Sequence, residues 1–343
     1  MNIDLITSFV PEFREIFIRR YEILEFLNKE GTLGRRSLSS KLELSERVIR
    51  EEVQILRDMN CVEVSVAGIS ITKEGKINLR NLVDIYRELN NLTELGNKIA
   101  SLLGVKKVMV VKGNASKLDH TYTTLGAETA SVIEDSLCNG DVLGVTGGRT
   151  LSSIADEMEV SKRNLDVTVI PARGSLGKSV KYQANSIASK IAAKLGCEYQ
   201  LLPVPDTASP EAMKMLMEND EVRDAYHKLK NLDILVFGIG RADVMLDRRN
   251  IDQKTRDMIL ERDAVAEAFG HYFTIDGTEV YRSQSIGITI EDFLKIPRII
   301  GVAGGAEKAE AIISIATLRS DMILVIDESC AKKIVNIKNK FRI

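Results

Sequence analysis

Four glycine-rich segments of this 343-residue chain carry residue types that could bind an anion. Glycine lets a ligand approach the backbone closely, and free N–H groups at the start of a following helix attract negative charge. One such loop is weak evidence, because tight strand-to-helix turns need glycine in any case, but four together predict a phosphorylated ligand. Guanidinium groups match the geometry of phosphate especially well. The segments are 145–150 (VTGGRT), 171–177 (PARGSLG), 237–240 (FGIG) and 302–308 (VAGGAEK), and the cations close to them are Arg149, Arg173, Arg248 and Lys308.

None of these segments matches a nucleotide-binding pattern. The sequence has no G-x-x-x-x-G-K-[ST] in them and no G-x-G-x-x-G with its downstream acidic residue, so we expect no nucleotide cofactor, and nothing indicates another cofactor. Metal sites need clustered soft ligands. The four cysteines are scattered without C-x-x-C spacing, so we expect no metal either.

The sequence offers little for catalysis on a sugar phosphate. Proton transfer between adjacent sugar carbons needs a base, usually a carboxylate and often assisted by histidine. The histidines, His120, His227 and His271, all lie outside the four segments, and Asp243 and Glu267 are the nearby carboxylates that could serve. We therefore predict a binding protein without catalytic residues, rather than an enzyme. The alternative is a sugar-phosphate isomerase or deaminase with an added DNA-binding head.

From residue 105 onward, short β-branched runs alternate with helical stretches such as 184–195. This alternation is typical of an α/β domain, in which helices cover both faces of a parallel sheet and ligands bind beyond the carboxyl ends of the strands. We therefore predict an effector-binding domain over 105–343. Its expected strands are 108–112, 142–146, 167–172, 234–238, 299–303 and 322–327.

The first 76 residues indicate a separate winged helix-turn-helix domain that binds double-stranded DNA. Expected helices at 16–29, 35–42 and 45–59 are followed by β-prone runs at 61–65 and 69–72. In the third helix Ile49, Val53 and Leu56 share one face, and Ser45 is a suitable N-cap. The formal net charge of −2 does not itself favour nucleic acid, so the prediction depends on a local basic cluster between residues 34 and 50.

Polar side chains on the outward face of this motif are the predicted DNA contacts. Arginine and glutamine can bond to guanine and adenine edges in the major groove, whereas residues at the start of the preceding helix meet backbone phosphate. The alternative is that Arg47 and Glu51 are only an i,i+4 pair on a solvated helix. The predicted contacts are Arg35, Arg36, Ser37, Ser45, Arg47, Arg50 and Gln54.

Residues 77–104 form an amphipathic stretch without proline, which we predict to be a linker helix. It either packs on a domain or pairs with a second copy of the chain. Regulators of this kind commonly read two half-sites as dimers, so we expect a homodimer or homotetramer. No apolar run approaches the roughly 20 residues that cross a bilayer, and no basic leader precedes the first apolar stretch, so a cytoplasmic protein without membrane contact is expected.

Several longer motifs resemble one known family almost from end to end. They are GRRSLSSKLELSERVIREEV (34–53), TGGRT (146–150), PARGSLG (171–177), YQANSIA (182–188), GIGRADVMLDRRN (238–250), DAVAEAFGHYF (263–273) and VAGGAEKAEAI (302–312). These segments are similar to the SorC/DeoR-like family of sugar-phosphate-responsive bacterial repressors. The resemblance implies a C-terminal domain similar to the ribose-5-phosphate isomerase and glucosamine-6-phosphate deaminase folds. In the branch that the motifs match, it implies that fructose-1,6-bisphosphate weakens assembly of the repressor on the operator of the glycolytic gapA operon.

The resemblance also implies which residues hold the effector. Gly148, Arg149 and Thr150 would line one phosphate pocket with Lys308, and Arg173, Leu176, Gly177 and Gln183 would form the other side of the cleft. Arg248 would reach a phosphate, and Glu267, as a pure acceptor, would bind sugar hydroxyls. Arg149 stands where one member of the family has threonine, a difference that would tighten or shift phosphate binding. An effector with one phosphate, such as a sorbitol or deoxyribose phosphate, is the alternative ligand.

Overall fold

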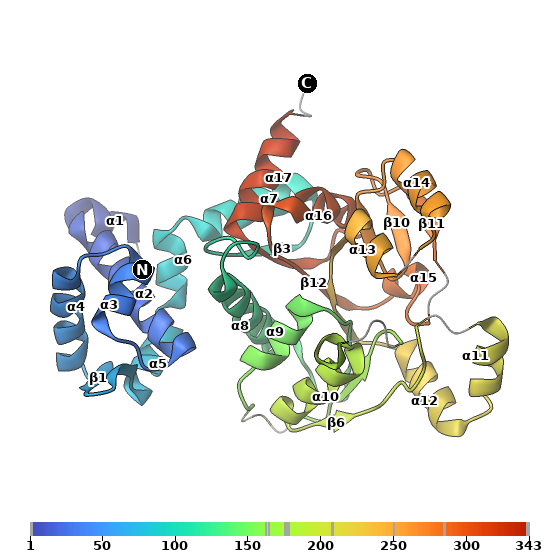
Figure 1. Cartoon of the computed structure of the whole chain (residues 1–343), viewed down its shortest axis with the longest axis horizontal. Helices are drawn as coiled ribbons and strands as arrows, with labels where there is room; N and C mark the ends of the chain where they lie inside the picture. Colours follow the sequence, from blue (N-terminus) through green and yellow to red (C-terminus); the bar gives the residue numbers. More distant parts are fainter. Residues whose placement is uncertain are drawn as a thin grey trace. The chain divides into compact units, whose positions relative to one another are not determined.

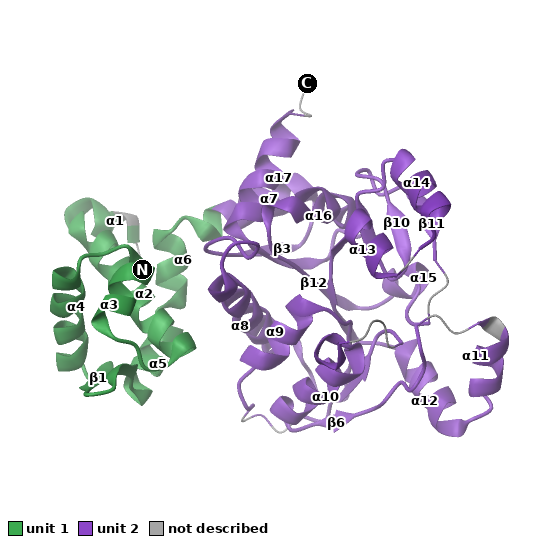
Figure 2. Cartoon of the chain, in the orientation of Figure 1, with its two compact units in different colours: residues 1–94 green, residues 95–343 purple. Residues whose placement is uncertain are grey.

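The structure, a computed structural model, describes residues 3–161, 163, 165–174, 179–206, 209–249, 251–283 and 286–340. The chain divides into two compact units, Met1–Glu94 and Leu95–Ile343 (Figure 2). Each unit has its own cluster of buried hydrophobic side chains. Within the ranges described, no helix combines the length and the apolar character that crossing a membrane requires.

The N-terminal unit consists of short helices and one β-hairpin. Its elements are α1 (Ile3–Phe9), α2 (Glu12–Glu30), α3 (Arg35–Leu42), α4 (Glu46–Asp58), β1 (Val62–Ser65), β2 (Gly68–Ile71), α5 (Lys73–Asn81) and α6 (Val83–Leu89). The predicted helix-turn-helix and hairpin are confirmed. Ile49, Val53 and Leu56 of α4 are buried in the core of the unit, and Ser45 caps α4 by accepting a hydrogen bond from the backbone N–H of Val48 at 3.3 Å.

A buried carboxylate ties α4 to α2. Glu52 is 5% exposed and accepts hydrogen bonds from Arg19 Nη1 at 2.9 Å and from Arg20 Nε at 2.7 Å. A buried charge is tolerated only when it is paired and hydrogen-bonded, so these contacts favour one packing of α4 against α2. The exposed face of α4 is thereby held in one orientation.

The stretch 77–104 differs from the single linker helix that the sequence predicts. The structure has three helices, α5, α6 and α7 (Leu92–Leu103), interrupted at Leu82 and at Asn90–Asn91. Asn91 adopts a φ of 57°, a left-handed conformation that asparagine tolerates better than most residues, and this turns the chain between α6 and α7. Leu79 and Tyr86 pack into the core of the N-terminal unit, so α5 and α6 belong to that unit.

The C-terminal unit contains the predicted parallel sheet (Figure 1). Its strand order is β3-β13-β12-β7-β4-β5-β6, and every pairing is parallel. The six predicted strands are confirmed to within one or two residues, whereas β6, only two residues long, was not predicted. The strands are β3 (Lys107–Val111), β4 (Val142–Val145), β5 (Thr168–Pro171), β6 (Glu198–Tyr199), β7 (Ile234–Gly238), β12 (Arg298–Ala303) and β13 (Ile323–Asp327).

The order of the strands produces a switch point between β4 and β7. From β4 the chain proceeds through β5 to β6 at one edge, then returns to β7 and proceeds through β12 and β13 in the opposite direction. The connections after β4 and β7 therefore leave the sheet on either side of one crevice, which is where open parallel sheets bind ligands.

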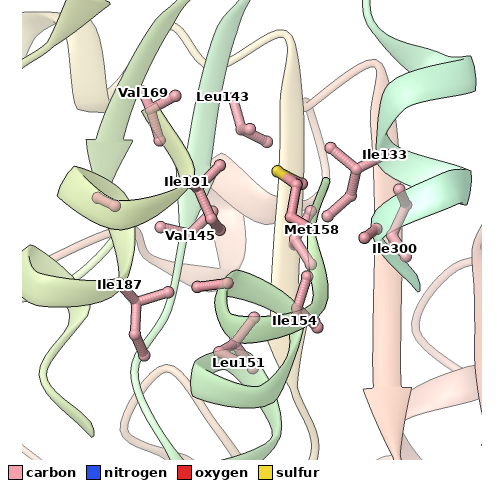
Figure 3. Packing of buried hydrophobic residues seen from close by; sticks show 14 of the residues in the cluster. Ile133, Leu143, Val145, Leu151, Ile154, Met158, Val169, Ile187, Ile191 and Ile300 are labelled. Atoms are coloured by element: carbon pink, nitrogen blue, oxygen red, sulfur yellow. The ribbon is translucent and has the colours of Figure 1, made fainter. Parts of the chain in front are cut away.

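Helices pack on the sheet through alternate residues of the strands. Figure 3 shows Leu151 and Ile154 of α9 (Arg149–Glu157), with Ile187 and Ile191 of α10 (Ala184–Leu195), packed near Val145 of β4. The intervening strand residues are buried as well, so the sheet is covered on both faces. The remaining helices are α8 (Asp119–Ser136), α11 (Pro210–Leu216), α12 (Asp220–Leu229), α13 (Ala242–Arg248), α14 (Gln253–Glu261), α15 (Ile290–Phe293), α16 (Ala309–Ala316) and α17 (Glu328–Lys340), with short 3-10 turns at Val180–Tyr182 and Ala306–Lys308.

A second, antiparallel sheet follows β7 and was not predicted from the sequence. Its order is β11-β10-β9-β8, formed by β8 (Gly240–Arg241), β9 (Ala266–Ala268), β10 (His271–Phe273) and β11 (Glu279–Arg282). Strands of two to four residues are too short to show a period of two in the sequence. This small sheet, with α13 and α14, adds a second wall beside the switch point.

We expect Glu52→Gln to loosen the attachment of α4 to α2. Breaking a buried ion pair costs about 3–5 kcal/mol, and because Arg19 and Arg20 are partly solvated we expect the lower range of about 1–3 kcal/mol. Hydrogen exchange measured by mass spectrometry on peptides from α2 and α4 reports this opening free energy locally. Glu51→Gln is the matched control, since Glu51 is exposed and Arg47 is its one ion-pair partner among the described residues. Equal exchange in the two variants would show that Glu52 does not hold α4.

Candidate functional site

A cleft of about 580 Å³ lies at the carboxyl ends of β4, β5, β7 and β12. It is lined by the loops that follow these strands and by residues of the small sheet and α13. Because it sits at the switch point, backbone N–H groups and side chains from segments far apart in sequence converge on one space. Eight of the ten predicted effector residues line this cleft. They are Gly148, Arg149, Thr150, Arg173, Gln183, Arg248, Glu267 and Lys308. The other two, Leu176 and Gly177, lie outside the described residues.

The loop after β4 shapes one side of the cleft. Gly148 has a φ of 115°, which side-chain-bearing residues rarely adopt, and it precedes the first turn of α9. A Cβ on Gly147 would lie 2.7 Å from the carbonyl oxygen of Tyr182, so this position also requires glycine. The first N–H groups of α9 have no partner within the helix, and they make this helix start a suitable place for an anion.

Two cations in the cleft have no ion-pair or hydrogen-bond partner among the described residues. Lys308 is partly buried at the end of the turn that follows β12, and Arg248 is exposed at the end of α13. Burial lowers the pKa of the Lys308 ammonium below its ordinary value and nearby Arg248 adds to this effect, whereas the neighbouring Glu307 and Asp327 partly oppose it. A negatively charged ligand near Lys308 would oppose both effects, because an opposite charge favours the protonated form.

Arg149, at the start of α9, is held by two residues of α8. Its Nη2 donates to Asp119 at 2.6 Å, and its guanidinium lies 4.3 Å from the centre of the Tyr122 ring. Both partners belong to α8, and Asp119 is 94% exposed in its side chain. Because exposed ion pairs contribute little, Asp119 holds Arg149 only weakly and a phosphate could displace it.

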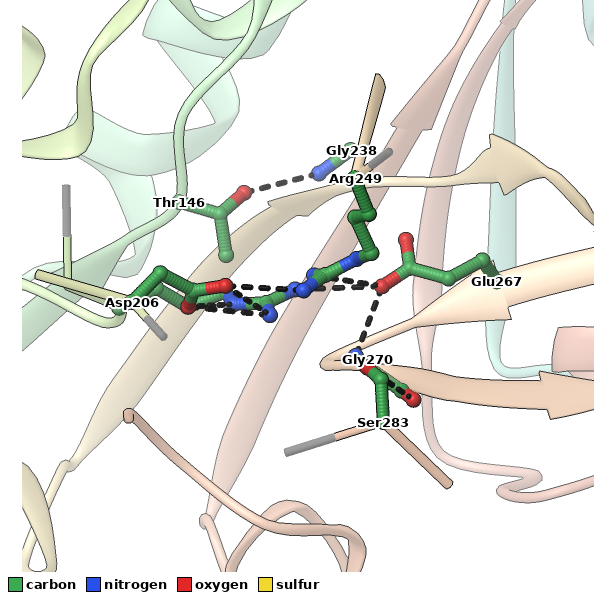
Figure 4. A network of polar contacts seen from close by, with 8 residues as sticks. Thr146, Asp206, Gly238, Arg249, Glu267, Gly270 and Ser283 are labelled. Carbon is green, nitrogen blue, oxygen red and sulfur yellow. Dashed lines mark hydrogen bonds and ion pairs between the residues drawn. The ribbon is translucent and has the colours of Figure 1, made fainter. Parts of the chain in front are cut away.

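A second group of charges lies at the base of the cleft and is fully paired. Arg249 lies between the carboxylates of Asp206 and Glu267 (Figure 4), at 2.8 and 3.1 Å. Arg173 contacts the same two acids, with Nε and Nη2 on Asp206 at 3.2 and 3.1 Å and Nη1 on Glu267 at 3.2 Å. Burial alone would raise the pKa of Glu267, but Arg173 and Arg249 hold it below its ordinary value. We refer to Arg173, Asp206, Arg249 and Glu267 as the charge network.

A buried aspartate organises the loops that carry Lys308. Asp327 ends β13 and is completely buried. One carboxylate oxygen accepts from the backbone N–H groups of Ala115 at 2.8 Å and Gly305 at 2.6 Å, and the other accepts from Ser329 Oγ and the N–H of Cys330. Asp327 therefore joins the turns after β3, β12 and β13 at one edge of the sheet.

Sequence reasoning missed Asp206, Arg249, Tyr122 and Asp327. The sequence analysis assigned Arg248 to the cleft, and Arg248 does line it. The adjacent Arg249 is instead buried and pairs with Asp206. The end of a predicted buried strand was a usable signal for Asp327. Asp206 follows a segment without regular structure, so no periodicity marked it. The described part of the chain contains no group of three or more His, Cys, Asp or Glu side chains that could hold a metal ion.

In the N-terminal unit, α3 and α4 present most of the predicted DNA contacts to solvent. Arg35, Arg36, Ser45, Arg47, Arg50 and Gln54 are exposed and Ser37 is partly buried. Arg47 does form the i,i+4 pair with Glu51, at 2.8 Å, and Gln54 donates to Asp58. Arg50 and Arg35 have no such partner among the described residues. Arg35 and Arg50 are therefore two cations of this surface that no described residue pairs with.

We expect the stability contributed by Glu267 to depend on pH. Since its folded-state pKa lies below the ordinary value of 4.5, the stabilisation is complete above that pH and is lost as pH falls through the folded-state pKa. At pH 7, Glu267→Gln should lower the unfolding free energy by about 3–5 kcal/mol, the usual cost of breaking a buried pair. The difference between wild type and variant, measured by urea unfolding from pH 7 to pH 3, should shrink at the acid end. Glu310→Gln, an exposed carboxylate on α16, is the control; a pH-independent difference for Glu267→Gln would contradict the assignment.

Comparison with known proteins assigns both units. A sugar-binding domain family (Sugar-bind) matches residues 87–336, and the CggR N-terminal DNA binding domain matches residues 16–102. The central glycolytic genes regulator of Bacillus subtilis is 36% identical over 326 residues, which cover 95% of this chain and 96% of the relative. The protein of the same name from Priestia megaterium is 34% identical and covers 97% and 98%.

Solved structures agree with this assignment. A SorC-family transcriptional regulator from Enterococcus faecalis matches with a TM-score of 0.67 and 28% identity, covering 71% of this chain and 99% of that one. The full-length sorbitol operon regulator SorC from Klebsiella pneumoniae has a TM-score of 0.66 at 18% identity and covers 92% and 97%, which supports the fold. The chain is a transcriptional regulator, not an enzyme, and it belongs to the SorC family, in the branch of the central glycolytic genes regulators.

Proposed function

We propose that this regulator is a cytoplasmic repressor of glycolytic genes, such as a gapA operon, and that fructose-1,6-bisphosphate bound in the cleft of the C-terminal unit controls its assembly on DNA. The names of its relatives support the glycolytic role. The phosphorylated effector is supported by the cleft itself. The protein acts as a homodimer or homotetramer in this proposal, because two copies are needed to read two half-sites.

The observation that carries the effector proposal is the distribution of charge in the cleft. Lys308 and Arg248 have no anionic partner among the described residues, and the start of α9 adds unpaired N–H groups. Leaving a partly buried cation such as Lys308 uncompensated is costly unless a ligand supplies the charge. Two unpaired cations and a helix start in one cleft suit a ligand of high negative charge, such as a bisphosphate.

The second candidate is a regulator that responds to a sugar with one phosphate. Two relatives with lower identity are named the deoxyribonucleoside regulator of Bacillus subtilis and the sorbitol operon regulator of Klebsiella pneumoniae. Such an effector would bring less negative charge to Lys308, Arg248 and the start of α9 than a bisphosphate does. Comparing mono- and bisphosphates in one binding assay separates the two candidates.

We expect Arg50→Ala to weaken DNA binding at least tenfold and to relax its sequence preference. Arg50 is exposed on α4 without a local partner, and a bidentate contact to a base contributes about 1–3 kcal/mol of discrimination. Gel-shift titration on duplexes selected by the wild-type protein from a random pool measures both effects. Lys76→Ala, an exposed lysine on α5, is the matched control and should bind as wild type does. Tight, selective binding by Arg50→Ala would contradict the assignment of α4.

We also expect fructose-1,6-bisphosphate to raise the thermal midpoint of the full chain. A ligand at 100 times its Kd stabilises the folded state by about 2.7 kcal/mol, because it binds only that state. Lys308→Ala and Arg173→Ala should reduce the shift, whereas Lys190→Ala, an exposed lysine on α10 outside the cleft lining, should retain it. An undiminished shift in the first two variants would place the effector elsewhere. Equal shifts with fructose 6-phosphate would favour an effector with one phosphate.

A further inference from the structure

Arg149 lines the cleft from the first position of α9, and two side chains of α8 hold its guanidinium group. Its Nη2 donates to the Asp119 carboxylate at 2.6 Å, and the guanidinium carbon lies 4.3 Å from the centre of the Tyr122 ring. Tyr122 also lines the cleft, whereas Asp119 is not among the lining residues. The ion pair therefore draws the guanidinium of Arg149 toward a residue outside the cleft lining.

Close packing of α8 on α9 fixes the positions of these residues (Figure 1). A Cβ on Gly126 of α8 would lie 2.7 Å from the carbonyl oxygen of Ser153 in α9, so glycine lets the two helices touch there. Ser153 Oγ also donates to the carbonyl oxygen of Tyr122 at 2.8 Å. The two helices are therefore held side by side, and the Tyr122 ring is kept within reach of Arg149.

The charged groups around Tyr122 belong to one cluster. Burial raises the pKa of the Tyr122 phenol above its ordinary value. Arg149 and Arg248 oppose this shift, whereas Glu307 and Asp327 add to it. Charges from α9, from α13 and from the segments after β12 and β13 are therefore near one ring that lines the cleft.

The cations of this cluster differ in how they are paired. Lys308, whose pKa the nearby Arg248 affects, has no ion-pair partner among the described residues, and neither does Arg248. Arg149 is paired with Asp119, the first residue of α8, whose side chain is 94% exposed. Exposed ion pairs contribute little to stability, and a carboxylate at the start of a helix is favourable without a cation because the helix dipole stabilises it. Release of Arg149 from Asp119 therefore costs little.

A phosphate at the start of α9 would offer Arg149 a stronger partner than Asp119. A phosphate monoester carries about 1.5 to 2 negative charges at neutral pH, and its oxygens can accept two parallel N–H bonds from a guanidinium. A cation at the N-terminus of a helix is unfavourable with the helix dipole, and an anion bound there removes this disadvantage. Arg149 therefore needs only to turn from one anion to the other, while its side chain stays against the Tyr122 ring.

We propose that Asp119 is a built-in competitor for the phosphate of the effector, and that Tyr122 is a positioning residue that keeps Arg149 ready to exchange one anion for the other. This inference rests on the proposed phosphorylated effector and adds the start of α8 to its binding site. Without a ligand, Asp119 holds Arg149. When the effector binds, its phosphate takes Arg149 and Asp119 is left to solvent. Asp119 thus lowers the affinity for the effector and raises the concentration at which the regulator responds.

A double-mutant cycle of Asp119 and Arg149 tests the competition. Titration calorimetry on the full chain measures the affinity for fructose-1,6-bisphosphate. We expect Asp119→Asn to raise this affinity about two- to fivefold, because the exposed pair that it removes is weak. Arg149→Gln should lower the affinity at least fivefold, because it removes a charge-assisted contact to phosphate. In the Arg149→Gln background, Asp119→Asn should change nothing. The same gain in both backgrounds would overturn the proposal, since Asp119 would then act by repelling the ligand at a distance.

Asp220→Asn is the matched control for Asp119→Asn. Asp220 is the first residue of α12, its side chain is 82% exposed, and it forms an ion pair with Arg223, but it lies outside the cleft lining. This variant should bind fructose-1,6-bisphosphate as the wild type does. A gain equal to that of Asp119→Asn would show a general effect of net charge and would contradict the proposed competition.

Two substitutions of Tyr122 separate its ring from its hydroxyl group. Tyr122→Phe keeps the face on which Arg149 lies and should bind as the wild type does, whereas Tyr122→Leu should weaken binding about two- to fivefold. The loss in Tyr122→Leu should disappear in the Arg149→Gln background, which general damage to the cleft would not produce. Equal losses in Tyr122→Phe and Tyr122→Leu would overturn the positioning role of the ring.

The wild-type titration separates this inference from the proposed function. Failure of the wild type to bind fructose-1,6-bisphosphate would overturn the proposed effector, and the order of the variants toward inorganic phosphate would then decide the inference. Binding by the wild type that Asp119→Asn does not strengthen would overturn the role of Asp119 and leave the effector in place. Inorganic phosphate should give the same order of affinities among the variants, because the proposed exchange involves the phosphate and not the sugar.

Discussion

Parallel pairing of β4, β7 and β12 is the constraint on which the C-terminal unit depends. Val145 of β4 lies in register with Val236 of β7, and Gly238 of β7 lies beside Val302 of β12. The carboxyl ends of the three strands therefore lie at the same edge of the sheet, and the chain leaves β4 and β7 in opposite directions. The loops after these strands border one crevice, and the small sheet and α13 complete its lining.

The chemistry of the cleft results from where charge is neutralised and where it is not. Buried charges are stable only when they are paired, and the charge network satisfies this requirement within the protein. Lys308 and Arg248 make no ion pair with a described residue, and the turn that carries Lys308 is held by the hydrogen bonds of Asp327. The turns that Asp327 joins are thus ordered by the protein itself, so little of the binding free energy is lost in ordering them when a ligand binds.

The sequence predicted the parallel sheet and the helix-turn-helix because both have strong local signals. The strands are continuous β-branched runs, and α4 combines a serine cap with apolar residues at spacings of four and three. The small antiparallel sheet was missed because β8 has two residues and β9 three. The break at Asn90–Asn91 was missed because the apolar periodicity continued through it with only a change of phase.

For the site, the sequence brought together residues on glycine-rich loops, whose types indicate anion binding by themselves. It did not identify Asp206, because this residue belongs to no sequence motif and contacts the site only through Arg173 and Arg249 in the folded chain. Its partners Arg173 and Arg249 are 33 and 43 positions away. Pairing at such separations is set by tertiary structure alone.

Effector and DNA can influence one another only if each binds two states of the protein with different affinity. The cleft is suited to this because its walls belong to different parts of one unit. Arg149 and Lys308 belong to the parallel-sheet side, whereas Arg248 and Glu267 come from α13 and the small sheet. A ligand that contacts both sides has its highest affinity at one spacing of the two walls, so occupancy of the cleft stabilises that spacing over others.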